Sequence, residues 1–268
     1  MGRVQDKVAF ITGAARGQGR SHAIALAREG ASIVATDLCG NVEWTTYRES
    51  TNDDLDETAR LVEAAGGRIV TAIADVRDRE ALRAAAELGM EAFGRLDIVV
   101  ANAGVGRMNA WDTVTDEIWQ QTIDINLTGV WNTVIETAPH LIAGGGGSMI
   151  LTSSAAGLKA MPFMAPYTAS KFAVTGLAKA LAQELSVHNI RVNSIHPAGV
   201  DTEMAKGESD AEVLFAKYPH LASIFANILP VTFMPPEDVS HAVLYLASDE
   251  SRYVTALSFA IDAGNSSY

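Results

Sequence analysis

The amino-terminal stretch of this sequence combines a strand, a glycine-rich turn and a helix in an order that few folds accommodate. Residues 7–12 (K-V-A-F-I-T) form a short apolar, β-branched run, which is typical of a strand buried in a parallel sheet. The turn that follows contains Gly13, Gly17 and Gly19, and a helical pattern then runs to Gly30. Glycines allow the backbone to approach a phosphate closely, and the helix N-terminus offers free N–H groups. The stretch therefore predicts a dinucleotide-binding unit.

Strand and helix patterns alternate along the remaining chain, with further strands expected at 31–36, 68–74, 96–101, 148–152, 191–196 and 256–262. No repeat or linker divides the sequence. We therefore predict an α/β protein: one Rossmann-like domain spanning 1–268, with a doubly wound parallel sheet of about seven strands and helices on both faces. Two segments interrupt the alternation. A mixed polar loop at about 38–52 reads as an insertion, and the strandless segment at about 198–235 suits a substrate lid.

An acidic residue, Asp37, ends the second predicted strand. At this distance beyond the last glycine, a carboxylate is placed to accept hydrogen bonds from the adenosine ribose and to repel a 2′-phosphate. Leu38 and Cys39 come next, so a basic residue that would favour the phosphate is missing. These features favour NAD over NADP; the alternative is that Asp37 only caps a loop.

A tyrosine and a lysine lie one helical turn apart, at Tyr167 and Lys171. Residues at i and i+4 share a helix face, so the ammonium can lie beside the phenol and lower its pKa towards neutrality. Taken alone, this spacing is also a frequent accident on helices. The preceding strand delivers two hydroxyls, Ser153 and Ser154, and parallel strands present their carboxyl ends to one crevice.

Charge and composition restrict the partners. The net charge of −12 and the pI near 4.9 exclude nucleic acid and anionic membranes as expected partners, because both would be repelled. One cysteine, Cys39, permits no internal disulfide, which fits a cytoplasmic setting. No metal site is expected, since the histidines are scattered without a His-Glu-x-x-His motif. The helix after Lys171 is apolar or small nearly all round, which predicts a homo-oligomer. We expect a tetramer, although this pattern leaves the number of copies open.

With these residues in place, the sequence resembles the short-chain dehydrogenase/reductase family over essentially its whole length. The resemblance rests on the glycine turn, Asp75, Asn102-Ala103-Gly104, Asn126, Ser154, Tyr167 and Lys171, in the family's order and approximate spacing. It implies that Tyr167 is the catalytic acid/base, that Ser154 orients the substrate oxygen, that Lys171 binds the nicotinamide ribose, and that Asn126 supports a proton-relay water. Ser154 has the family's spacing to the tyrosine, with Ser153 as the alternative.

The same resemblance implies a set of residues in contact with NAD. Besides the glycines it includes residues of the turn, of the strand ends and of the segment after the sixth strand. They are Gly13, Arg16, Gly17, Gln18, Gly19, Asp37, Leu38, Asp75, Val76, Asn102, Ala103, Gly104, Tyr167, Lys171, Pro197, Val200 and Thr202.

The insertion after Asp37 makes the chain similar to a particular subgroup, the carveol dehydrogenase-like, mycofactocin-associated members. Because the loop carries Trp44 and Tyr47 and directly follows the ribose-binding acid, we expect it to fold over the adenosine half of the cofactor. The subgroup resemblance implies NAD that is held without exchange and is reoxidised in place by an external redox carrier.

Apolar residues flank the tyrosine and fill the predicted lid, and they favour a hydrophobic secondary alcohol or ketone, such as a carveol-like monoterpenol. The candidates for the substrate pocket are Leu158, Met161, Phe163, Met164, Met204, Phe215 and Phe225. Two other functions remain open. One is a 3-oxoacyl carrier-protein reductase, against which Asp37 argues, and the other is a non-catalytic nucleotide-binding scaffold.

Overall fold

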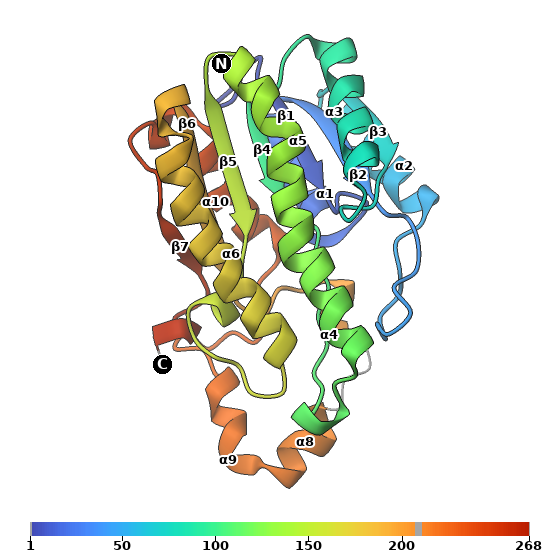
Figure 1. Ribbon diagram of the computed structural model, residues 1–268, viewed down its shortest axis with the longest axis vertical. Coiled ribbons are helices and arrows are strands. Elements are labelled where there is room, and N and C mark those ends of the chain that lie inside the picture. The colour runs from blue at the N-terminus through green and yellow to red at the C-terminus, as the bar shows by residue number, and fades with distance from the viewer. Residues whose placement is uncertain (1, 207–210, 268) are drawn as a thin grey trace.

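A parallel sheet of seven strands lies at the centre of the protein in the computed structural model, which describes residues 2–206 and 211–267 (Figure 1). Across the sheet the order is β3-β2-β1-β4-β5-β6-β7. The bounds are β1 Val8–Thr12, β2 Ser32–Asp37, β3 Ile69–Ile73, β4 Ile98–Ala101, β5 Gly147–Thr152, β6 Ile190–Pro197 and β7 Ser258–Ile261. The predicted doubly wound sheet is confirmed. Residues 1 and 268 of the predicted domain, and 207–210 of the predicted lid, lie outside the described residues.

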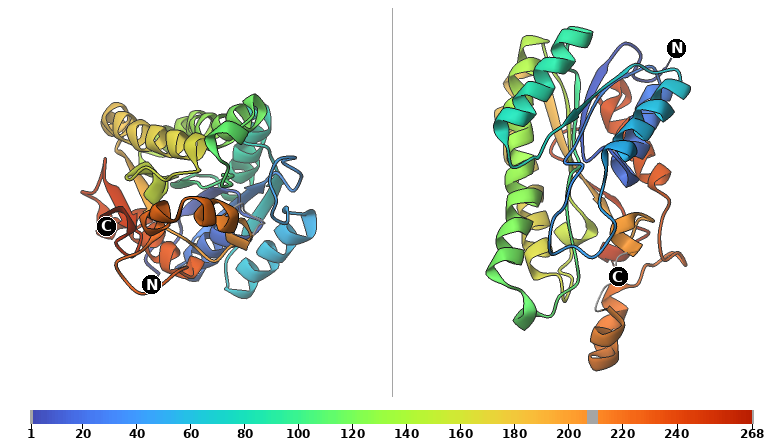
Figure 2. Two further views of the ribbon diagram at one scale, coloured as in Figure 1. Left: turned by 90° about the horizontal axis from the view of Figure 1, so that it is seen from below. Right: turned by 90° about the vertical axis from the view of Figure 1, so that its right-hand side faces the viewer.

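Helices cover both faces of the sheet, as the edge-on view in Figure 2 shows. One face packs against α3 (Arg79–Phe93), α5 (Gly129–Ala143) and α6 (Ala165–Glu184), and the other against α1 (Gly17–Arg28), α2 (Asn52–Ala64) and α10 (Pro236–Ala247). Strands β1, β2 and β4 are buried along their whole length, which explains why they read as continuous apolar runs. Within the described ranges, no helix is long and apolar enough to cross a lipid bilayer.

The chain reverses its direction of travel across the sheet between β1 and β4. From β1 it moves outward through β2 and β3, and it then returns to place β4 on the other side of β1. Helices on opposite faces leave a crevice at such a reversal, outside the carboxyl ends of the strands. Gly13 and Asn102 follow directly after β1 and β4, so both belong to this crevice.

Two segments extend beyond the carboxyl ends of the strands (Figures 1 and 2). The insertion, residues 38–51, joins β2 to α2 without helix or strand, and a capping box between Thr51 and Asp54 starts α2. The second segment contains α7 (Glu203–Lys206), α8 (Ala211–Lys217) and α9 (Pro219–Ala222). An isolated bridge between Val200 and Met234 ties its two ends together.

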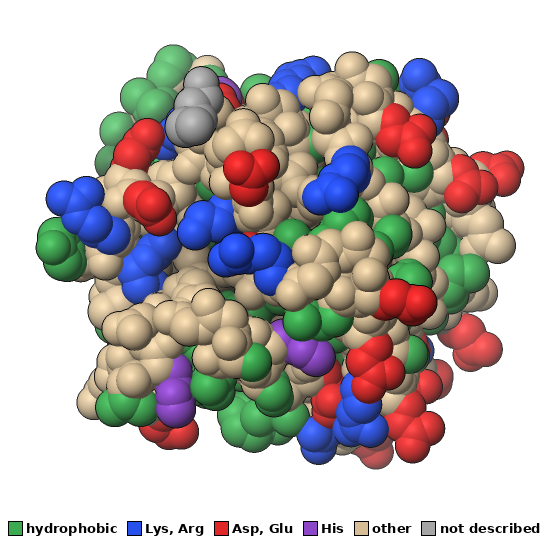
Figure 3. Space-filling model, turned by 90° about the horizontal axis from the view of Figure 1, so that it is seen from above, with side chains coloured by type: hydrophobic (Ala, Val, Ile, Leu, Met, Phe, Trp, Pro, Cys, Tyr) green, Lys and Arg blue, Asp and Glu red, His purple; other side chains and the backbone are tan. Residues whose placement is uncertain are grey.

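The amino ends of the strands form the opposite pole of the molecule, where Lys and Arg side chains gather near the middle of the face in Figure 3. Lys7, Arg95, Arg191 and Arg252 line a hollow there of about 430 Å³. Arg95 pairs with the buried Asp97 at 2.5 Å, and Arg191 donates to carbonyl oxygens at the end of α10. Arg191 therefore joins β6 to the end of α10, whereas Arg95 pairs with the carboxylate just before β4.

Candidate active site

Helix α6 brings the predicted tyrosine and lysine together. Pro166 lies in its first turn, where a missing N–H costs nothing, and Tyr167 and Lys171 follow on one face. Lys171 is 3% exposed, and its Nζ lies 5.5 Å from the centroid of the Tyr167 ring. The ammonium donates a 2.8 Å hydrogen bond to the carbonyl of Thr152, the last residue of β5. The lysine thus links the helix to the sheet edge beside the phenol.

Burial controls the proton affinities of this pair. It raises the pKa of the Tyr167 phenol, although the hydrogen bond with Ser154 lowers it, and it lowers the pKa of the Lys171 ammonium to about 8. The net direction of the Tyr167 pKa is therefore opposite to the one expected from the lysine alone. The physical reason is that removal from water disfavours the charged form of each group, and this is the largest cause of both shifts.

The two adjacent serines make different contacts. Ser153 Oγ donates to the carbonyl of Lys171 at 2.8 Å and lies 3.2 Å from Thr175 Oγ1, so α6 engages this hydroxyl. Ser154 Oγ accepts from the backbone N–H of Ala156 at 3.1 Å and forms a hydrogen bond with Tyr167. Of the two, the hydroxyl of Ser154 is the one that pairs with the phenol.

Asn126 lies in η2 (Asp124–Thr128), a π-helical turn between α4 (Asp116–Ile123) and α5. Its side chain is fully buried and bonds both backbone groups of Val105 at 2.8 Å. A Cβ on Gly104 would stand 3.2 Å from Asn126 Oδ1 and 3.5 Å from Lys171 Nζ. The asparagine therefore holds the loop after β4 close to the lysine, and such π-turns are frequent at functional sites.

The glycine turn has the geometry that a pyrophosphate requires. Helix α1 begins at Gly17 with no side chain capping its first N–H groups and no acid in its first turn, so its positive end is open to an anion. Gly13 has a φ of +66°, and a Cβ there would stand 2.9 Å from Ala103 Cα. A Cβ on Gly19 would stand 2.1 Å from the carbonyl oxygen of Gly13. Gly19 is thus required for packing inside the turn.

Most of the predicted cofactor residues line one groove at the β1/β4 reversal. They are Gly13, Arg16, Gly17, Gln18, Asp37, Leu38, Asp75, Val76, Asn102, Ala103, Gly104 and Thr202. Of the other predicted residues, Tyr167, Lys171, Pro197 and Val200 line an adjoining cavity of about 480 Å³. Gly19 lines neither space, because it packs against Gly13 inside the turn. Gln18, Asn102, Gly104 and Thr202 belong to both linings, so the two spaces meet there.

The carboxylate of Asp37 is buried and already engaged. It accepts from the backbone N–H groups of Ala15 and Cys39, each at 3.0 Å, and from Ser50 Oγ at 2.6 Å. A carboxylate accepts about four hydrogen bonds, so at least one position remains for a ribose hydroxyl. Asp75 differs, since Arg77 binds its carboxylate at 2.6 Å, a contact that the sequence pattern did not indicate.

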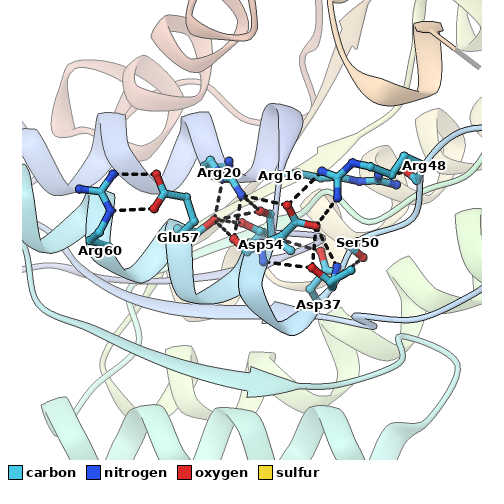
Figure 4. A network of polar contacts seen from close by, with 12 residues as sticks. Arg16, Arg20, Asp37, Arg48, Ser50, Asp54, Glu57 and Arg60 are labelled. Carbon is cyan, nitrogen blue, oxygen red and sulfur yellow. Dashed lines mark hydrogen bonds and ion pairs between the residues drawn. The ribbon is translucent and has the colours of Figure 1, made fainter.

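The insertion is fastened over the groove by the polar network in Figure 4. Arg48 binds the carboxylate of Asp54 with two hydrogen bonds, at 2.8 and 3.0 Å, and the guanidinium holds the pKa of Asp54 at about 2. Arg20 reaches the Asp54 carbonyl at 2.7 Å, while Arg16 donates to the Arg48 carbonyl. Together with Ser50 on the Asp37 carboxylate, these contacts join the loop to α1, α2 and the end of β2.

The insertion reaches further than the sequence indicated. Thr46 and Tyr47 line the 480 Å³ cavity, and Tyr47 also lines the groove, so the insertion borders both spaces. The ring of Tyr47 lies under the Arg16 guanidinium at 5.7 Å, and burial raises the pKa of its phenol to about 12. Only the presence of aromatic residues in the insertion pointed to such a role.

The cavity beside Tyr167 is mainly apolar. Five of the predicted substrate residues line it, namely Met161, Met164, Met204, Phe215 and Phe225. Phe163 instead packs its ring against those of Phe215 and Tyr218, and Leu158 is 36% exposed, so the predicted role of these two in the lining is not seen. Arg107 and Met108 from the loop after β4, and Phe233, complete the wall and were missed in the sequence.

An uncapped helix start after a glycine turn, a buried acid at the end of β2 and a tyrosine–lysine pair beside an apolar cavity define the class: a dinucleotide-dependent oxidoreductase with an α/β fold. Residues 7–213 match the family model described as short chain dehydrogenase. The chain belongs to this family.

Individual relatives span the whole chain. A (-)-trans-carveol dehydrogenase of Rhodococcus erythropolis is 45% identical over 98% of this chain and 99% of its own length. The structure of a short chain dehydrogenase from Mycobacterium paratuberculosis bound to NAD is 52% identical, covers 100% of both chains and superposes with a TM-score of 0.97. A carveol dehydrogenase from Mycobacterium avium in complex with NAD is 50% identical over 99% of each chain, with a TM-score of 0.92.

Proposed function

We propose that this protein transfers a hydride between NAD and a hydrophobic secondary alcohol or ketone, with Tyr167 exchanging the proton. The observation that carries the proposal is the paired hydroxyls of Tyr167 and Ser154 at an apolar cavity that adjoins the glycine-turn groove. A hydrophobic carbinol in this cavity can bring its oxygen to both hydroxyls while its hydrocarbon part contacts methionine and phenylalanine side chains.

The groove offers backbone and side-chain groups that fit NAD. The uncapped start of α1 would bind the pyrophosphate, and the remaining acceptor position on Asp37 would receive a ribose hydroxyl. When bound, NAD accepts or returns the hydride. Thr202 and Gln18, at the junction with the larger cavity, are placed to contact its nicotinamide end, and the buried Oε1 of Gln18 has no hydrogen-bond partner within the described residues.

The remaining roles follow from position. Ser154 holds the substrate oxygen and Tyr167 donates a proton to it during ketone reduction, because burial keeps the phenol protonated at neutral pH. In the reverse direction the phenol must first lose its proton, and the ammonium of Lys171 stabilises the resulting charge. Asn126 keeps the loop after β4 close to Lys171. We also assign to Asn126 the support of a relay water.

The substrate class is a carveol-like monoterpenol. The flexible methionines Met161, Met164 and Met204 suit a compact, irregular hydrocarbon, and the cavity of about 480 Å³ is large enough for a molecule of about ten carbon atoms. The resemblance to the two carveol dehydrogenases supports this choice.

The groove and its insertion would hold NAD without exchange, so that an external redox carrier would have to reoxidise it in place, as the resemblance to the mycofactocin-associated subgroup implies. The network from Arg48 and Ser50 to the groove supports this proposal, because the loop must detach before a bound nucleotide can leave. A lid at 198–235 covers the substrate cavity, and in it the ring centroids of Phe215 and Phe225 lie 5.3 Å apart.

In this proposal the protein is a homotetramer and acts in the cytoplasm. Three large apolar side chains on the outer surfaces of α5 and α6 support the assembly: Trp131 is 41% exposed, Ile142 38% and Phe172 44%. Helices α5 and α6 lie side by side on one face of the sheet, so a second copy of the chain can cover these residues together (Figure 1).

The test begins with protein purified without added cofactor and dialysed extensively. We expect bound NAD to remain, and carveol to reduce an artificial electron-accepting dye without free NAD. Tyr167→Phe should retain NAD and its melting temperature but lose turnover by about 10³-fold or more, because only the proton-transfer group is removed. Cofactor-free protein that turns over freely with added NAD contradicts tight binding, and an active Tyr167→Phe variant contradicts the acid/base role.

A further inference from the structure

A buried histidine, His196, connects strand β6 to Ser154 where the sheet ladder ends. Strands β5 and β6 pair up to Thr152 and Ile195, after which the chain leaves β5. The carbonyl of Ser154 lies beyond the ladder, and His196 Nδ1 meets it at 2.9 Å. The imidazole therefore takes the place of a strand-to-strand hydrogen bond at the point where Ser154 enters the active site.

The hydrogen bonds define which nitrogen of His196 carries the proton. A carbonyl oxygen only accepts, so Nδ1 must donate to Ser154. In a neutral imidazole Nε2 is then the acceptor, and Ser194 Oγ, 2.8 Å away on the same strand, donates to it. Burial lowers the pKa of His196, which favours this neutral form. Both ring nitrogens are thus satisfied inside the protein, and the ring has one preferred orientation.

Strand β6 holds the side chain of Ser154 as well. Pro197, the residue after the histidine, accepts from Ser154 Oγ through its carbonyl at 3.4 Å. On the other side, the first turn of η3 (Ala155–Gly157) donates from the Ala156 N–H to Ser154 Oγ at 3.1 Å. Two consecutive residues of β6 therefore contact the carbonyl and the hydroxyl of the same serine, and this limits both its peptide plane and its side chain.

We propose that His196 is a positioning residue that orients the Ser154 peptide, so that the Ser154 hydroxyl faces Tyr167 and the substrate oxygen. Its ring has no contact with the reacting atoms in this proposal and acts only through the serine. The inference rests on the proposed role of Ser154. A displacement of a reacting group by about 1 Å can reduce a rate by about 100-fold, so loss of this contact has a measurable effect.

The experiment is a double-mutant cycle in the full-length, NAD-loaded protein, with carveol and an electron-accepting dye as probes. His196→Leu keeps the volume and removes both hydrogen bonds, and we expect kcat to fall about 10- to 100-fold with bound NAD unchanged. His196→Asn places its amide nitrogen near the position of Nδ1 and should restore most of kcat. In the Ser154→Ala background, His196→Leu should cause no further loss, because the serine through which it acts is gone.

The outcomes distinguish a failure of the proposed role of Ser154 from a failure of the positioning role of His196. If Ser154→Ala retains full kcat, the serine's role in the proposed function is wrong and the inference falls with it. If Ser154→Ala loses activity while His196→Leu does not, or if the two losses multiply in the double variant, only the positioning role is overturned. A readout that needs no variant is histidine ¹⁵N NMR of the native protein. It should show a neutral ring protonated at Nδ1, and protonation at Nε2 alone would overturn the inference.

Discussion

The hydrogen bond from Ser50 to Asp37 is the contact that ties the insertion most directly to the cofactor groove. Ser50 Oγ lies 2.6 Å from Asp37 Oδ1, and the carboxylate is 7% exposed. Ser50→Ala removes this bond while it leaves the pairing of Arg48 with Asp54 intact. We predict that the variant folds normally and releases NAD faster, because the insertion, which lines the groove and is proposed to cover the nucleotide, is held by one contact fewer.

The magnitude follows from the kind of bond that is lost. A hydrogen bond to a charged, desolvated acceptor contributes about 1.5–3 kcal/mol. If this bond must break before the nucleotide leaves, its loss lowers the barrier to release by that amount. Since each 1.4 kcal/mol corresponds to a factor of ten, NAD should dissociate about 10- to 150-fold faster.

The assay measures NAD that stays with the protein over time. Purified protein is loaded with NAD and transferred to buffer that contains an excess of a distinguishable analogue such as thio-NAD, and the original nucleotide is quantified after rapid desalting. The control is Arg60→Ala, which breaks the exposed pair of Arg60 and Glu57 on α2, drawn beside the network in Figure 4. This pair does not touch the insertion, so its loss should leave the release rate unchanged.

Three results would refute the reasoning. An unchanged rate in Ser50→Ala would mean that the loop does not control release. A slower rate would mean that Ser50 competes with the ribose for Asp37 and does not hold the loop closed. Equal acceleration in Arg60→Ala would assign the effect to general destabilisation of α2.

Three further substitutions test other parts of the site. Gly106→Ala would put a Cβ 2.9 Å from Cδ2 of the Tyr167 ring, so the ring must move, and kcat in the carveol and dye assay should fall about tenfold or more without loss of NAD. Phe225→Ala removes a ring that packs against Phe215 and should raise KM for carveol about tenfold, with a smaller effect on kcat. Burial lowers the pKa of Lys171 from 10.5 to about 8, so between these pH values the unfolded chain binds a proton that the native protein lacks. In urea titrations of cofactor-free protein, stability relative to Lys171→Met should rise by up to about 3 kcal/mol over this interval, and a fall would contradict the burial argument.

The local patterns of the sequence were sufficient for the fold and for much of the site. Each predicted strand is present, with ends shifted by one or two residues, because buried parallel strands leave continuous apolar runs. The glycine turn and Asp37 lie in one groove because both are at the carboxyl ends of neighbouring strands, β1 and β2. Tyr167 and Lys171 share a helix face because the spacing of four residues is a property of the helix itself.

The tertiary structure decided what depends on residues that are distant in the sequence. The partners of Ser153 and Ser154 lie on α6 and β6, so their adjacent positions could not distinguish them. The pKa of Tyr167 depends on burial by many elements, which no spacing encodes, and the reach of Tyr47 depends on how an irregular loop folds. Periodicity and spacing describe each element along its own axis, whereas burial and hydrogen-bond partners arise only when separate elements pack together.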